Sequence, residues 1–134
     1  YKRQIIDDTI KNNIIVNSRD EFNEKRFLDA INKSKVNNFV KNFSDGYDTM
    51  MGDNGAFFSG GQAQRIILAR CLYSQKKIYI LDEATGALDE ETEKQIFKDI
   101  QDNLSSKTII AVTHNTGLKK YFNKILNIKN GSLI

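Results

Sequence analysis

The sequence predicts an α/β fold in which a mostly helical segment, residues 1–75, precedes part of a parallel sheet, residues 76–134. Three observations support this prediction. Apolar residues recur at helical spacing through the first half, whereas the second half contains two short β-rich apolar runs, "IYIL" and "TIIAV". The segment between those runs again has helical spacing, which predicts a strand, a helix and a parallel strand. At 134 residues the chain has the size of one domain with one modest core.

In the first half, residues 1–17 predict a loop that leads into a short helix. Ser18 and Glu21 have the Ser-x-x-Glu spacing that caps a helix start. Apolar residues then recur on one helical face at Phe27, Leu28 and Ile31, and on a second at Val36, Phe39, Val40 and Phe43. The stretch "SDGYDTMMGDNGAFF" predicts a loop because glycine interrupts it at positions 46, 52 and 55.

In the second half, the two β-rich runs are typical of strands that are buried on both faces of a sheet. A helix is predicted from about Glu90, and its buried face would carry Ile96, Phe97, Ile100 and Leu104. The tail "KILNIKNGSLI" predicts a hairpin, because its Asn130-Gly131 pair suits a type I′ turn.

Composition excludes several classes of protein. Twenty basic residues against 17 acidic ones give a formal charge of +3 with the signs interspersed, so no nucleic-acid partner is expected. No apolar run approaches the roughly 20 residues that span a bilayer, so a membrane link would need a partner. The only cysteine, Cys71, favours a reducing compartment. The opening "YKRQIIDD" has no signal-peptide pattern and looks like a cut into a longer chain.

The stretch "SGGQ" indicates an anion-binding helix start. Ser59 and Gln62 have the spacing of a capping box, which predicts a helix from Gly60 or Gly61 to about Tyr73. Glycines expose the first backbone amides at the positive end of the helix dipole, which suits phosphate. An ordinary capped helix with a flexible entry explains the same residues.

Two further signals follow the predicted strands. Asp82 and Glu83 end the first strand at the carboxyl edge of the sheet, where one carboxylate can support Mg²⁺ and the next can polarise a water. His114, the only histidine, follows the second strand and is expected beside Glu83, where it can contact a phosphate oxygen. Each signal alone also fits a bland alternative, a solvated acidic turn or a structural histidine.

Taken in order, "SGGQAQR", "IYILDEATGALD" and a β-run ending in His114 resemble the nucleotide-binding domain of ABC transporters, and "DDTIKNNI" and "FSDGYDTMMGDNG" resemble exporter-type members. The resemblance covers nearly the whole chain. It implies part of a P-loop NTPase (ABC ATPase) fold, with a helical signature subdomain before half of a RecA-like parallel sheet. It implies ATP and Mg²⁺ as ligands and an ATP hydrolase that drives transmembrane export. The implied partners are a second nucleotide-binding domain and a transmembrane permease, at the cytoplasmic face of the cell membrane.

By the same resemblance, the signature residues contact the γ-phosphate of an ATP held by the opposite subunit; they are Ser59, Gly60, Gly61 and Gln62. Asp82 would support Mg²⁺, Glu83 would be the catalytic base and His114 the switch residue. Asp89 would be the D-loop aspartate that crosses the dimer interface.

The chain departs from the family pattern at four positions. Phe58 replaces the usual signature leucine, Gly86 a D-loop serine and Asn115 an arginine, and "TMMGDNG" lacks the glutamate often found there.

The phosphate loop G-x-x-x-x-G-K-[ST] occurs nowhere in the sequence, and Gln4 lies too close to Thr9 to serve as the Q-loop glutamine, whose expected position falls on Tyr1. The chain is therefore expected to be the carboxyl-terminal portion of a nucleotide-binding domain, inactive alone and prone to associate through an unpaired sheet edge.

Two alternatives stay open. One is the carboxyl-terminal ATPase lobe of a structural-maintenance-of-chromosomes or DNA-repair protein, although "DDTIKNNI" lacks the heptads that precede such lobes. The other is a non-catalytic dimerisation module that offers its signature helix to another subunit's nucleotide. The sequence does not indicate the transported substrate.

Overall fold

The computed structural model describes residues 5–16 and 21–133. Its helices are α1 (Ile10–Ile15), α2 (Glu24–Lys33), α3 (Asn37–Val40), α4 (Gly60–Tyr73) and α5 (Glu90–Asn103). Its strands are β1 (Ile78–Asp82), β2 (Thr108–Val112), β3 (Ile128–Lys129) and β4 (Ser132–Leu133). Three short 3-10 helices complete the order: η1 (Gly46–Asp48), η2 (Asp53–Gly55) and η3 (Thr116–Tyr121).

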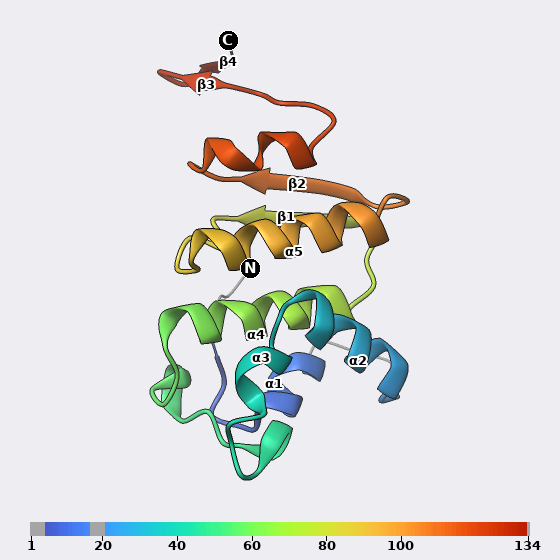
Figure 1. Ribbon diagram of the computed structural model, residues 1–134, viewed down its shortest axis with the longest axis vertical. Coiled ribbons are helices and arrows are strands. Elements are labelled where there is room, and N and C mark those ends of the chain that lie inside the picture. Colours follow the sequence, from blue (N-terminus) through green and yellow to red (C-terminus); the bar gives the residue numbers. More distant parts are fainter. Residues whose placement is uncertain (1–4, 17–20, 134) are drawn as a thin grey trace.

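The first half, residues 5–73, is a cluster of helices around α4, which α1 and α2 both contact (Figure 1). We call it the helical half. Its core consists of fully enclosed apolar side chains, including Ile10, Ile31, Val36 and Ile66. The predicted buried face of α2 is confirmed at Phe27 and Ile31, but Leu28 is 45% exposed.

The predicted start of α2 is wrong. Glu21 lies before the helix, and Asn23 is the cap, because its side chain accepts a hydrogen bond from the Arg26 amide. Ser18 lies outside the described residues, as do Tyr1 and Gln4.

A buried polar pair joins the chain entry to α4. Arg70 on α4 donates from Nε to the Asn13 carbonyl at 2.6 Å and from a terminal nitrogen to Asn13 Oδ1 at 2.9 Å. Asn13 Nδ2 in turn donates to the carbonyls of Ile6 and Thr9, each at 3.0 Å. Burial lowers the pKa of Arg70, but the guanidinium stays charged at neutral pH. The pair therefore fixes the loop before α1 to the last turn of α4.

The second half, residues 78–133, is built on a βαβ unit, and we call it the α/β half. Strands β1 and β2 are parallel and in register from Ile78 opposite Thr108 to Asp82 opposite Val112, with α5 as the crossover helix. The predicted face of α5 is confirmed, because Ile96, Phe97 and Ile100 are buried and Leu104 packs partly buried against them. The terminal hairpin is also confirmed, since Asn130 and Gly131 both have the positive φ that a type I′ turn requires.

The expectation that β1 and β2 are buried on both faces is wrong for this chain. Tyr79 and Leu81 point into the core, whereas the opposite face of the sheet is open. Ile78, Ile80, Ile110 and Val112 are 58%, 68%, 50% and 51% exposed there. Among the described residues, the parallel sheet has only the two strands β1 and β2. The helix α5 covers one face of this sheet, and the other face is exposed.

Few polar contacts connect the two halves outside the site described below. Lys35, between α2 and α3, forms a 2.5 Å ion pair with Asp99 on α5. In Figure 1 the helical half and the β3–β4 hairpin lie at opposite ends of the molecule, with the βαβ unit between them. Across residues 5–16 and 21–133, no helix combines the length and apolar character needed to cross a membrane.

Candidate functional site

The start of α4 is capped as the sequence predicts. Ser59 Oγ accepts a hydrogen bond from the Gln62 amide at 3.2 Å, and Gln62 Oε1 accepts one from the Ser59 amide at 2.9 Å. The first bond of the helix ladder runs from Ala63 N to Ser59 O. The amides of Gly60 and Gly61 therefore lie ahead of the ladder, at the positive end of the helix dipole.

The two glycines differ in their surroundings. A Cβ at Gly61 would lie 2.9 Å from the Ala87 carbonyl oxygen, closer than real side chains approach a backbone. A Cβ at Gly60 would meet only the Ala87 Cβ, at an ordinary 3.7 Å. Gly61 thus lets the loop after β1 pack against the helix start. The sequence analysis predicted only that the glycine would let a ligand approach. Gly60 is exposed and stays open to solvent.

Gln64, which the sequence reading missed, connects the same two segments. Its Oε1 accepts a hydrogen bond from the Ala87 amide at 2.9 Å, and its Nε2 lies 3.5 Å from the Glu83 carbonyl oxygen. Its position two residues after Gln62 carried no signal, because glutamine is common on helix surfaces. The side chain fixes the loop that carries Glu83 to the first turns of α4.

The carboxyl ends of β1 and β2 bring the predicted acid and base groups together. Glu83 Oε1 lies 3.0 Å from His114 Nε2, with the two side chains 49% and 92% exposed. Glu83 has φ +45°, an uncommon conformation for a residue with a side chain, and its amide bonds to the Val112 carbonyl at the end of β2. Asp82 ends β1 on the open face, opposite Val112.

A shallow groove of about 330 Å³ lies at this edge of the sheet. It is lined by groups from the loop after β1, by Glu93 on α5 and by the loop after β2, among them Glu83, Thr85, His114 and Asn115. Glu93 is only 7% exposed although its side chain ends in a carboxyl group. The sequence did contain a signal for it, because position 93 shares the helical face of Ile96, Phe97 and Ile100.

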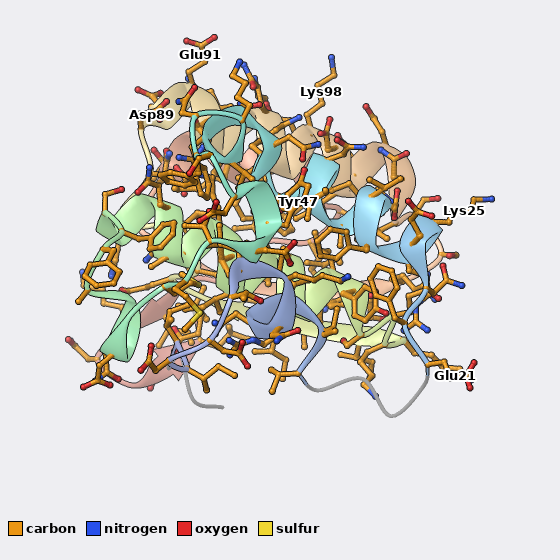
Figure 2. All side chains as sticks on the ribbon, turned by 90° about the horizontal axis from the view of Figure 1, so that it is seen from below. Glu21, Lys25, Tyr47, Asp89, Glu91 and Lys98 are labelled. Carbon is orange, nitrogen blue, oxygen red and sulfur yellow. The ribbon has the colours of Figure 1, made fainter. Side chains whose placement is uncertain are left out.

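Asp89 caps α5, and its side chain accepts a hydrogen bond from the Thr92 amide at 2.8 Å. The pKa of Asp89 is lowered, first by that backbone hydrogen bond, then by the Thr92 hydroxyl and to a smaller degree by Arg65. Figure 2 shows Asp89 and Glu91 at the periphery near the start of α5. In this chain Asp89 therefore has a structural function, whichever surface it meets.

Metal ligands are sparse at the site. Within residues 5–16 and 21–133, no three histidine, cysteine, aspartate or glutamate side chains gather in a way that could enclose a metal ion. A single carboxylate such as Asp82 still fits Mg²⁺, because this ion commonly keeps several waters and takes its other ligands from phosphates.

Comparisons with known proteins decide the family. The profile of the ABC transporter family matches residues 3–86. The chain belongs to the ABC transporter family. ATP-dependent lipid A-core flippases from Aliivibrio fischeri and Legionella pneumophila are similar to it, with 36% and 35% identity over 130 residues. Each match covers 97% of this chain and 22% of the flippase, so this ABC transporter segment spans about a fifth of these relatives.

A solved structure agrees with the fold. The structure of a bacterial Atm1-family ABC exporter with ATP bound matches 97% of this chain and 23% of that chain, with a TM-score of 0.88 and 32% identity. The helical cluster and the small parallel sheet of the ABC segment therefore correspond to part of an exporter's nucleotide-binding domain, as the sequence predicts.

Proposed function

We propose that this chain is the carboxyl-terminal portion of the nucleotide-binding domain of an ABC exporter, and that it hydrolyses ATP together with the remaining portion. The observation that carries this proposal is the 3.0 Å contact between Glu83 and His114 at the carboxyl edge of β1 and β2. A carboxylate and an imidazole at that edge can manage an attacking water and a terminal phosphate. The family match favours this function over the chromosome-maintenance alternative.

The helix start would contact the nucleotide of a second copy. The Gly60 and Gly61 amides lie ahead of the helix ladder and can donate to a γ-phosphate. The Ser59 hydroxyl, which accepts a bond from the Gln62 amide, can still donate one to the same phosphate. Gln62 would act mainly by fixing this geometry through the capping box, and Asp89 would face the partner copy beside it.

The sheet edge would manage hydrolysis of a nucleotide bound to the same copy. Glu83 would accept a proton from the attacking water, and His114 would donate a hydrogen bond to the terminal phosphate. Asp82 would hold Mg²⁺, which when bound supplies positive charge beside the phosphates. Closure and reopening of the two copies would drive a transmembrane permease at the cytoplasmic face of the membrane.

A chimera tests the proposal. We would replace the matching 130-residue segment of the Aliivibrio fischeri lipid A-core flippase by this chain and measure ATP hydrolysis of the purified transporter. We expect hydrolysis that falls at least about 100-fold in Glu83→Gln, the size of effect typical of a lost general base. Glu91→Gln, an exposed carboxylate on α5, is the matched control and should leave the rate unchanged. A folded chimera whose hydrolysis survives Glu83→Gln would refute the assigned role of Glu83.

The exposed start of α4 at Gly60 supports a second function, that of a dimerisation module. On this alternative the chain presents its helix start to the nucleotide of an intact domain without catalysing hydrolysis. Mixing the chain with an intact ABC nucleotide-binding domain should then give ATP-dependent association in sedimentation, lost when Ser59 is replaced by aspartate. Hydrolysis by the isolated 134-residue chain that is abolished in Glu83→Gln would contradict both this alternative and the expected inactivity of the isolated chain.

A further inference from the structure

The buried side chain of Glu93 lines the same groove as Glu83 and His114. Both oxygens of Glu93 accept hydrogen bonds: Oε1 from the Thr85 hydroxyl at 2.6 Å, and Oε2 from the Asn115 side-chain amide at 2.5 Å. Hydrogen bonds that a carboxylate accepts are among the stronger ones in proteins. One side chain on α5 therefore holds a residue from the loop after β1 and a residue from the loop after β2.

The two residues held by Glu93 are neighbours of the site residues. Thr85 follows Glu83 by two positions, and Asn115 directly follows His114. The loop after β2 is also braced internally, because Asn115 Oδ1 accepts from the Gly117 amide at 2.9 Å and the Asn115 amide donates to Thr113 Oγ1 at 3.0 Å. Thr85 is 4% exposed, so its loop is anchored at that point.

Glu93 is itself held rigidly. It lies at the first turns of α5, on the face that continues with Ile96, Phe97 and Ile100, all at most 4% exposed. Glu83 and His114, in contrast, are half and almost fully exposed, so packing contributes little to their positions. Their 3.0 Å separation depends mainly on the two loops that carry them, and Glu93 is the point where those loops meet.

We propose that Glu93 is a positioning residue, which sets the distance between Glu83 and His114 by tying Thr85 and Asn115 to α5. It touches neither side chain of the pair and is not a catalytic residue. The expected effect of Glu93 on hydrolysis rests on the proposed function, whereas its effect on the two loops does not. It also assigns a role to Asn115, which must present a hydrogen-bond donor to the carboxylate.

The chemistry of the contact suggests a reversible disruption. Asn115→Asp places a second carboxylate against Glu93, so the two acceptors repel each other and the loops separate. Adding Glu93→Gln restores complementarity, because the amide introduced at position 93 can donate to the new carboxylate and still accept from Thr85. Glu91→Gln, an exposed change on the same helix, is the matched control.

His114 is the only histidine, so the imidazole gives a single set of NMR signals in the 134-residue chain. We expect Asn115→Asp to shift the imidazole Nε2 resonance and to remove contacts between the Glu83 and His114 side chains. Glu93→Gln/Asn115→Asp should return both toward wild type, and Glu91→Gln should leave them unchanged. Circular dichroism tests whether each variant is folded. Thr85→Val, which removes one of the two donors to Glu93, replaces any variant that does not fold. It should shift the Nε2 resonance in the same direction by a smaller amount.

In the flippase chimera, Asn115→Asp should lower kcat about tenfold, equivalent to one strong hydrogen bond, with little change in KM for ATP. The double variant should recover most of that loss. Unchanged His114 signals in folded Asn115→Asp and Thr85→Val, or no recovery in the folded double variant, would overturn the role of Glu93. If the His114 signal of the 134-residue chain is altered but hydrolysis by the chimera does not depend on Glu83, the proposed function would instead be refuted and the role of Glu93 in the loops would stand.

Discussion

The helical half and the α/β half enclose the same kind of residue in different ways. Ile31 and Ile66 of the helical half are fully buried among other helices, whereas Ile80 and Ile110 of the α/β half are 68% and 50% exposed on the open face of the sheet. The helical half thus supplies its own core, and the α/β half is covered by α5 on one side only. The site lies where these two halves meet, at the contact between the start of α4 and the loop after β1, which we call the seam.

The largest contrast is expected between truncations of isoleucine in the two halves. Ile31→Ala removes a side chain with no exposed area and leaves a cavity, so the free energy of unfolding should fall by about 2–5 kcal/mol. Ile80→Ala should change it by no more than about 0.5 kcal/mol, because most of that side chain already contacts water. Urea denaturation followed by circular dichroism measures both variants.

Equal losses of unfolding free energy at these two positions would contradict this difference between the halves. They would show that the open face of the sheet is covered in solution, by a second copy or by another part of the chain. Sedimentation of the wild-type chain across a range of concentrations distinguishes these two covers, since only association with a second copy depends on concentration.

The glycine pair tests the seam itself. Gly61→Ala should destabilise the chain by roughly 1–3 kcal/mol relative to Gly60→Ala, because its Cβ would collide with the Ala87 carbonyl. Both substitutions improve helix propensity, so their difference isolates the collision. Thermal and urea unfolding of the two variants give the comparison, and equal stabilities would mean that the loop after β1 moves away without cost.

Gln64→Ala should have a smaller effect, of about 1 kcal/mol, because it removes the side chain that bonds Ala87 across the seam. The control is Gln95→Ala on α5, whose side chain bonds only within its helix, to Glu91 at 3.3 Å. Hydrogen exchange at the Ala87 amide provides the sharper measurement. It should accelerate in Gln64→Ala and stay unchanged in Gln95→Ala.

The smallest expected effect is the charge of the Asp89 cap. Asparagine also caps helices well, so Asp89→Asn keeps the acceptor and removes the charge. Because the pKa of Asp89 is lowered in the folded chain, its charge stabilises the fold above the ordinary aspartate pKa of about 3.9, and this contribution disappears as the pH falls through the lowered value. Wild type should therefore exceed the variant in stability at pH 7, and the difference should shrink as the pH falls below the ordinary aspartate pKa of about 3.9, measured by urea midpoints. A difference that persists in acid would assign the effect to geometry instead.

Local chemistry made the site predictable from sequence. The Ser59–Gln62 capping box and the Asn130-Gly131 turn involve residues within three positions, so their spacing alone fixes the geometry. The meeting of Glu83 and His114 required one further step, that neighbouring parallel strands end at the same edge. The roles of Asp82 and of the signature residues toward a nucleotide stay predictions.

Tertiary contacts made the rest unpredictable. The sequence pattern of an apolar strand is the same whether its isoleucines are buried under another layer or exposed to water. The pattern therefore did not predict the open face of β1 and β2. The start of α2 was predicted wrongly because Ser18 and Glu21 also have the spacing of a helix cap, whereas the cap in the structure is Asn23. Gln64 acts across 19 and 23 residues of sequence on Glu83 and Ala87, a partnership that only the folded chain defines.

The contact between Asn13 and Arg70 connects the segment before α1 directly to the last turn of α4. Asn13 donates to the carbonyls before α1 and also accepts from the Arg70 guanidinium in the last turn of α4. A force on residues 6–9 therefore reaches the helix without passing through the 56 residues between Asn13 and Arg70. The contact is thus a mechanical link between two segments that lie far apart in the sequence.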